Sequence, residues 1–238
     1  MKGEPLLHPS LGAFLDAAAG RGFDVSLTTN GTLVAETAPA LLAAANLSKL
    51  SISLHSHIDS DSLEDYWRGV STFLDLHRAR PNFPVSLRLW NLRRGRLPPG
   101  TARLLALVQA RYGNTFDLAD GVAEGLHAAS ALPTSIRLDQ GVFLNQAEEF
   151  AWPGLELPRL GTRGFCRGLG NQVAILVDGT VVPCCLDGEG AIALGNILEA
   201  PLAVILASPR ARAMREGFAR RELAEPLCMT CGYRTRFD

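Results

Sequence analysis

All five cysteines of this 238-residue chain lie between positions 166 and 231. Random placement would scatter them, so their confinement strongly constrains what the last 73 residues, Cys166 to Asp238, can fold into. In a reducing compartment, clustered cysteines usually hold a metal or take part in catalysis rather than form disulfides. We therefore expect this part of the chain to fold around thiolate ligands.

The spacing of four cysteines suits a single site. The pattern is Cys166-x12-Gly179-x4-Cys184-x43-Cys228-x2-Cys231. Asp178-Gly179 separates two β-rich runs, which predicts a two-residue hairpin that returns Cys184 toward Cys166. A Cys-x2-Cys pair on a turn directs two sulfurs to one side. Cysteines are also buried for packing alone, but four in this pattern favour a metal site. The spacing suits an iron–sulfur cluster and zinc equally.

Composition limits the other classes of function. The formal net charge is -1, so no global field favours nucleic acid or an anionic membrane. With 47% hydrophobic and 20% charged residues, the chain has ordinary globular composition. No apolar run reaches membrane-spanning length, and the first residues lack the shape of a signal peptide. We expect a cytoplasmic protein with no nucleic-acid partner and no membrane segment.

The first half alternates between strand-like and helix-like periods. Strands are expected over 24–28, 49–54 and 85–90, and helices over 11–20, from 39 onward, over 61–81 and over 101–112. Such alternation predicts βαβ units on a parallel sheet, hence an α/β fold. Chemistry in these sheets sits at the carboxyl ends of the strands.

The change in character near Cys166 predicts two domains. We expect a first domain over residues 1–150 and a linker over 151–165, which contains the loop sequence Trp152-Pro153-Gly154. A small domain of a β-hairpin and helices is expected over 166–238, with one helix from about Pro209 to Arg220.

Several features of the C-terminal part carry a resemblance. They are the Cys-x12-Gly-x4-Cys spacing, the run from Gly179 to Cys185, Leu194-Gly195-Asn196-Ile197, and the closing Cys228-x2-Cys231-Gly232-Tyr233. This segment resembles the auxiliary-cluster domain of radical S-adenosylmethionine (radical SAM) enzymes, of the SPASM and twitch type. The further cysteines of the full SPASM pattern are absent, which favours the single-cluster twitch form. The resemblance implies an auxiliary [4Fe-4S] cluster on Cys166, Cys184, Cys228 and Cys231. Cys185 does not fit the Gly-x4-Cys spacing.

The first half resembles the same superfamily. Gly3-Glu4-Pro5 is similar to the glycine–glutamate–proline motif at the end of the second strand of the barrel. The resemblance implies an S-adenosylmethionine site formed by Gly3, Glu4, Pro5, Thr29, Asn30, Ser53 and Arg88. A carboxylate suits the methionine ammonium and an arginine suits its carboxylate. The implied fold of the first domain is a partial TIM-like β/α barrel with parallel strands.

The sequence departs from the superfamily at one decisive place. The Cys-x3-Cys-x2-Cys loop precedes the glycine–glutamate–proline motif in radical SAM enzymes, but no cysteine here precedes Cys166. The first βα unit of the barrel is therefore expected to be missing. A truncated gene or a wrongly assigned start is the favoured explanation. A degenerate family member and a partner chain that supplies the missing piece are the others.

The resemblance implies a parent activity, namely radical-based modification or dehydrogenation of a small molecule or peptide. Its cofactors would be the cluster and S-adenosylmethionine, and its electron donor a protein such as flavodoxin or ferredoxin. Two alternatives remain open from the residues. One is a non-enzymatic iron–sulfur binding or electron-transfer module, and the other is a zinc-stabilised interaction domain.

Overall fold

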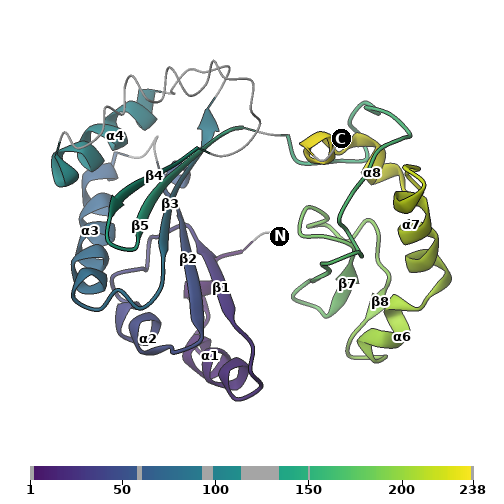
Figure 1. The fold of residues 1–238 in the computed structure, drawn as a ribbon, viewed down its shortest axis with the longest axis horizontal. Coiled ribbons are helices and arrows are strands. Elements are labelled where there is room, and N and C mark those ends of the chain that lie inside the picture. Colours follow the sequence, from purple (N-terminus) through teal and green to yellow (C-terminus); the bar gives the residue numbers. More distant parts are fainter. Residues whose placement is uncertain (1–2, 58–60, 93–98, 114–133, 150, 237–238) are drawn as a thin grey trace. The chain divides into compact units, whose positions relative to one another are not determined.

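The computed structural model describes residues 3–57, 61–92, 99–113, 134–149 and 151–236 (Figure 1). The chain divides into two compact units, Glu4–Glu149 and the residues that follow from Phe150. Each unit is treated by itself below. No helix in the described ranges combines the length and apolar character needed to cross a membrane.

The first unit is built on a five-stranded, mainly parallel sheet. Its strands are β1 (Val25–Thr29), β2 (Leu47–Ser53), β3 (Val85–Leu92), β4 (Thr134–Asp139) and β5 (Val142–Glu148). The order across the sheet is β1-β2-β3-β5-β4. Neighbours among the first four are parallel, and β4 is antiparallel to β5. The α/β class and the parallel arrangement expected from the sequence are confirmed.

Helices join these strands. They are η1 (Pro5–Leu7), α1 (Leu11–Ala19), α2 (Ala38–Ala43), η2 (Leu54–Ser56), α3 (Leu63–Ala79) and α4 (Pro99–Tyr112). The expected elements are present with shifted ends. β2 ends at Ser53 because Leu54, which is fully buried, enters a 3-10 turn. β3 runs on to the buried Leu92, where the Glu149 N–H donates to the Leu92 carbonyl.

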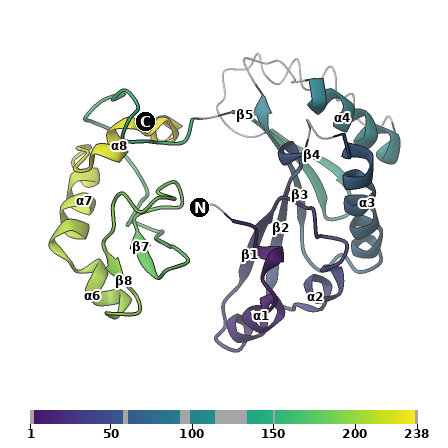
Figure 2. The same ribbon diagram turned by 180° about the vertical axis from the view of Figure 1, so that it is seen from behind.

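The two faces of the sheet differ in chemistry. Leu50, Ile52, Leu87 and Leu89 are fully buried on one face. They pack with residues of α1 to α4 in one cluster that also contains Phe73 and Leu104, and all four helices lie on the same side of the sheet (Figures 1 and 2). The other face carries polar side chains. Phe143 also lies on this face, and its described polar members are Ser26, Thr28, Lys49, Ser51, Ser53, Ser86, Arg88, Asn145, Ser135 and Arg137. We call it the polar face.

The second unit has short strands and short helices. They are β6 (Ala174–Ile175), β7 (Thr180–Val182), β8 (Gly195–Asn196), α6 (Leu202–Leu206), α7 (Pro209–Ala219), α8 (Pro226–Thr230) and η3 (Gly232–Arg236). β7 is the central strand of an antiparallel sheet. The hairpin predicted at Asp178-Gly179 joins β6 and β7. Gly179 has φ +87°, a left-handed conformation that glycine adopts without strain.

Residues 151–165 were expected to be a linker, but they are built into the second unit. The Leu160 N–H donates to the Met229 carbonyl at 2.8 Å, and the Gly164 N–H donates to the Arg221 carbonyl at 3.0 Å. These backbone bonds tie the segment to the end of the chain. Prolines and glycines alone gave it the composition of a linker, whereas its partners lie 57 and 69 residues away in sequence.

Candidate functional site

Two loops place the first pair of cysteines. Cys166 precedes a tight turn in which the Gly168 N–H donates to the Cys166 Sγ at 3.4 Å. Cys184 follows β7 and Pro183. A Cβ atom at Gly168 would lie 3.3 Å from the Pro183 carbonyl oxygen and 3.6 Å from the Cys166 Sγ. The absence of a side chain at Gly168 therefore lets the first cysteine loop lie against the segment that leads to Cys184.

A short helix places the second pair. Cys228 lies inside α8, and Cys231 is the residue that ends it, where its N–H donates to the Cys228 carbonyl at 3.4 Å. Glu225 begins the same helix, and its carbonyl accepts from the Cys228 N–H at 3.0 Å. Both cysteines thus have backbone positions fixed by one helical turn.

The four thiols lie within electrostatic reach of one another. Burial and then the negative charges of Cys166, Cys184 and Cys231 raise the pKa of the Cys228 thiol. Burial raises the pKa of Cys184 to about 11, and Cys166 adds to the effect. Burial, and to a smaller extent Cys231, raise the pKa of Cys166. The four cysteines that the sequence pattern predicts as ligands therefore lie close enough to affect one another's pKa, and their role as ligands stays a prediction.

The thiols form a loose group. Within the ranges that the structure describes, no three histidine, cysteine, aspartate or glutamate side chains surround a point that one metal ion could occupy. Backbone N–H groups nevertheless already point at two of the sulfurs. Those of Leu186 and Asp187 hydrogen-bond to Cys184, and those of Arg167 and Gly168 to Cys166, and each favours the charged thiolate. N–H donors to thiolate sulfur are a means by which proteins tune iron–sulfur clusters. The donor set and its surroundings fit such a cluster.

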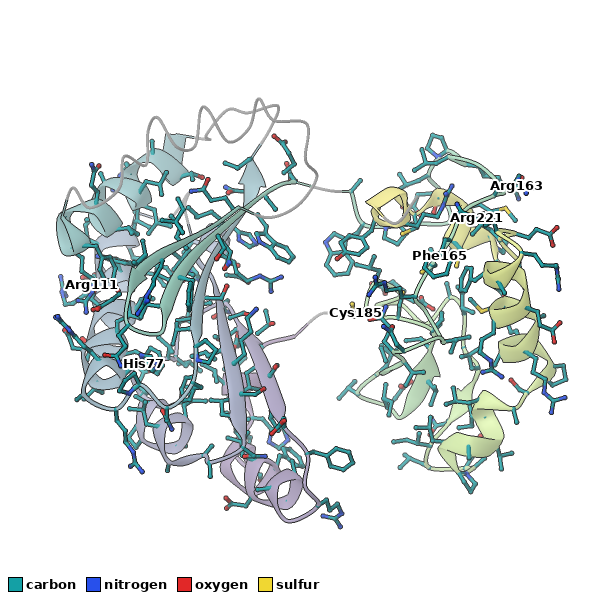
Figure 3. All side chains as sticks on the ribbon, viewed as in Figure 1. His77, Arg111, Arg163, Phe165, Cys185 and Arg221 are labelled. Atoms are coloured by element: carbon teal, nitrogen blue, oxygen red, sulfur yellow. The ribbon has the colours of Figure 1, made fainter. Side chains whose placement is uncertain are left out.

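Cys185 differs from the other four cysteines. Its side chain is exposed, whereas each of the other four is half-buried (Figure 3). Its negative charge contributes to the raised pKa of Cys184, after burial and Cys166. Its position next to Cys184 and its exposure agree with its exclusion from the predicted ligand set.

Sequence reasoning missed several residues that support this group. Asp187 is buried, and its carboxylate accepts from the Ala191 and Ile192 N–H groups at 2.8 Å each. Arg210 forms a two-armed ion pair with Glu225 at 2.7 and 2.8 Å, at the start of α8. No spacing rule links these residues to the cysteines, so only the fold reveals them.

The residues predicted to bind S-adenosylmethionine form two groups at the carboxyl-end edge of the sheet. In the first, Glu4 joins η1 to the end of β1. Its carboxylate accepts from the Leu6 N–H at 3.0 Å, the Thr29 hydroxyl at 2.7 Å and the Asn30 N–H at 2.6 Å. The Tyr66 hydroxyl donates to the Asn30 carbonyl at 2.8 Å. Gly3 and Pro5 flank Glu4 in the chain, and Gly3 is exposed.

The second group lies on the next two strands of the sheet, β2 and β3. Ser53 and Arg88 are register partners on β2 and β3, and Arg88 is in turn the partner of Asn145 on β5. The Arg88 guanidinium carbon lies 3.4 Å from the centre of the Trp90 ring. The His55 ring donates to the Arg88 carbonyl at 3.1 Å, and burial lowers the pKa of His55. A half-exposed cation stacked on an aromatic ring is thus held at the polar face.

Comparison with known proteins supports the reading of the second unit. Residues 166–232 match the SPASM family model, described as an iron–sulfur cluster-binding domain. The match contains all four predicted ligands, and it identifies this part of the chain as SPASM-type. The crystal structure of selenomethionine BtrN in an open conformation aligns over 87% of this chain and 83% of its own, with 14% identity and a TM-score of 0.32. A TM-score this low does not establish a shared fold. No curated protein matches the sequence.

Proposed function

We propose that this chain holds one auxiliary [4Fe-4S] cluster through Cys166, Cys184, Cys228 and Cys231. The observation that carries the proposal is the gathering of these four thiols within the segment that matches an iron–sulfur domain. When bound, such a cluster supplies one-electron transfer at a potential set by its surroundings.

The residues of the chain would have defined tasks in holding this cofactor. Loading requires thiolates, so the protons held by the buried thiols of Cys184 and Cys228 must leave. The N–H groups at Gly168 and Asp187 would then stabilise the charge on the sulfurs that they contact. Partial burial of the sulfurs limits access of water, which protects a cluster and shapes its potential.

We further propose that the first unit is part of a TIM-like barrel in a radical SAM enzyme. Helices that cover only one face of a parallel sheet suit a barrel, in which helices form the outer ring. The polar face would then be the inner surface, where Ser53 and Arg88 meet the methionine carboxylate. Glu4 accepts three hydrogen bonds from the chain, and a carboxylate with about four acceptor positions retains capacity for an ammonium group.

The parent activity that we propose is radical-based modification or dehydrogenation of a small molecule or peptide, with electrons from a donor such as flavodoxin or ferredoxin. Since no cysteine precedes Cys166, we expect this chain alone not to cleave S-adenosylmethionine. The same observation favours a second candidate, a non-enzymatic iron–sulfur module. Detection of 5′-deoxyadenosine from the reduced, purified chain would exclude that candidate.

Metal analysis after anaerobic purification tests the cluster. We expect about four irons and four sulfides per chain, and loss of both in Cys228→Ala. Cys185→Ala is the matched control, since it removes the neighbouring exposed thiol, and it should keep the iron. A colourless protein with one zinc per chain would refute the cluster and support the zinc-stabilised domain.

Calorimetric titration with S-adenosylmethionine tests the first unit separately. We expect Arg88→Gln to weaken binding about tenfold, or about 1.4 kcal/mol. Arg137→Gln removes another arginine from the polar face and should leave the affinity unchanged. Absence of binding to the unaltered chain would reject this half of the proposal without affecting the cluster.

A further inference from the structure

Arg234 is a buried cation in the second unit. It lies in η3, three residues after Cys231, and only 4% of its surface is exposed. Burying a guanidinium is costly unless its surroundings compensate the lost hydration. Its location next to a set of thiols therefore calls for a physical reason.

The contacts of Arg234 connect the two segments that carry cysteines. Its Nε donates to the carbonyl oxygen of Cys228 at 3.2 Å. One terminal nitrogen donates to the carbonyl oxygen of Arg163, which lies three residues before Cys166, at 2.9 Å. The guanidinium thus bridges α8 and the loop that leads into Cys166. Both acceptors are backbone carbonyl groups of segments that carry predicted ligands.

The backbone leaves room for the guanidinium at two glycines. A Cβ atom at Gly164 would collide with one terminal nitrogen of Arg234, and a Cβ atom at Gly161 would lie 3.4 Å from the other. Both glycines have φ +151°, a conformation that other residues rarely adopt. The loop 161–164 therefore leaves room for the planar guanidinium of Arg234.

The charge of Arg234 lies close to a predicted ligand, because its Nε donates to the carbonyl oxygen of Cys228 itself. A positive charge at this place attracts any negative charge added at the sulfurs of the predicted ligands. An arginine remains charged at all accessible pH values, so the effect is permanent.

We propose that Arg234 raises the reduction potential of the cluster held by the four cysteines, and positions Cys228 and the Cys166 loop while doing so. Reduction adds one negative charge to an assembly that already contains four thiolates. A fixed cation nearby stabilises the reduced form more than the oxidised form. The inference rests on the proposed cluster and assigns this chain a residue that sets its electron affinity.

Redox titration of the anaerobically purified full chain, followed by electron paramagnetic resonance, tests the role of the charge. Arg234→Lys keeps a cation and Arg234→Gln removes it. Arg212→Gln, on the exposed side of α7, is the control for loss of a distant charge. We expect the Gln variant to favour the oxidised form about tenfold, a potential lower by about 59 mV for one electron. The Lys variant should retain most of the original potential, and the control all of it.

Three results would overturn the inference. Equal potentials in the Lys and Gln variants would show that charge is not the cause. An equal shift in Arg212→Gln would assign the effect to net charge alone. Loss of iron from both Arg234 variants would leave only a structural role. Absence of iron from the unaltered chain would instead refute the proposed cluster itself, so the two failures are distinguishable.

Discussion

Each of the two units is stabilised internally by different interactions. In Glu4–Glu149 the described residues include a single cluster of 26 buried hydrophobic residues, packed between one face of the sheet and α1 to α4. In the second unit the corresponding cluster has seven, around Met214 and Phe218. The strands of the first unit have five to eight residues, whereas those of the second have two or three. Burial of apolar surface can account for the stability of the first unit, but the smaller cluster of the second unit supplies much less of it.

Polar contacts supply part of the stabilisation that the small hydrophobic core of the second unit does not provide. The Asp187 carboxylate fixes the loop at Ala191 and Ile192, and Arg210 fixes Glu225 at the start of α8. Small domains with small cores commonly depend on a bound metal or on disulfides. In the proposed function, the cysteines would therefore have a structural task in addition to a chemical one. The second unit should depend on its cofactor for folding, and the first should not.

The largest expected effect is therefore cofactor removal. Stripping iron with a chelator should unfold or loosen the second unit, because cofactor binding free energy is then part of its folding free energy. Limited proteolysis should cut within residues 151–236 and spare the sheet unit. Cys228→Ala should reproduce this pattern without chelator. Equal resistance of both units to proteolysis in the iron-free protein would contradict the expected difference between them.

The next largest effect is expected from a substitution that would create a cavity in the core of the first unit. Phe73 is fully buried beside the ring of His77, whose Nε2 donates to the Phe83 carbonyl. Phe73→Ala should lower the free energy of unfolding of the first unit by about 3–5 kcal/mol. Denaturant titration measures the loss, while iron content should stay unchanged. Phe23→Ala, at a side chain 63% exposed, is the matched control and should cost far less. A loss of iron in Phe73→Ala would show that the units are energetically coupled.

A smaller effect concerns pH in the metal-free protein. Burial raises the pKa of Cys184 from 9.0 to about 11 and raises those of Cys166 and Cys228. The folded state therefore binds these protons more tightly than the unfolded chain. Stability is fully present below about pH 9 and is lost as pH rises toward about 11, by at most about 3 kcal/mol for Cys184. Thermal unfolding of the second unit across this range measures the slope, which Cys184→Ser should reduce. An unchanged slope would show that another group is responsible.

The smallest expected effect concerns the N-cap residues of two helices, one in each unit. The Ser208 hydroxyl accepts from the Ala211 N–H at 3.3 Å at the start of α7, whereas Ser10 at the start of α1 makes no such bond with its side chain. Ser208→Ala should cost about 1 kcal/mol of stability in the second unit. Ser10→Ala should change the first by less than about 0.5 kcal/mol. Chemical denaturation of both variants gives the values, and a larger loss at Ser10 would reverse the assignment of the caps.

Local rules predicted much of this structure. Alternating periods located helices α1 to α4 and the parallel strands β1, β2 and β3 but not β5, and Asp178-Gly179 located the hairpin between β6 and β7. These features depend on neighbours in sequence, which a pattern can reveal. Ser10 shows the limit, because a good capping residue at the right position makes no capping bond with its side chain.

The remainder depends on contacts between distant residues. Arg234 meets a carbonyl 71 positions earlier, and Leu160 is held by Met229. Glu4 was expected to face a ligand, but no pattern in the sequence indicated that it also caps η1 and anchors Thr29. Packing decides such pairings, and no period or spacing in one sequence encodes them. The cysteines differ, because their spacing in the sequence predicts a shared site before any contact is known.

The alternation along β2 and β3 has a consequence for how this protein can change over time. Ile52 and Leu87 maintain the core, while their immediate neighbours Ser53 and Arg88 lie on the polar face. Selection on what the polar face recognises acts on one set of positions, and selection on folding acts on the set between them. New recognition can therefore arise by exchange of every second residue, and the strands that carry it need not be rebuilt.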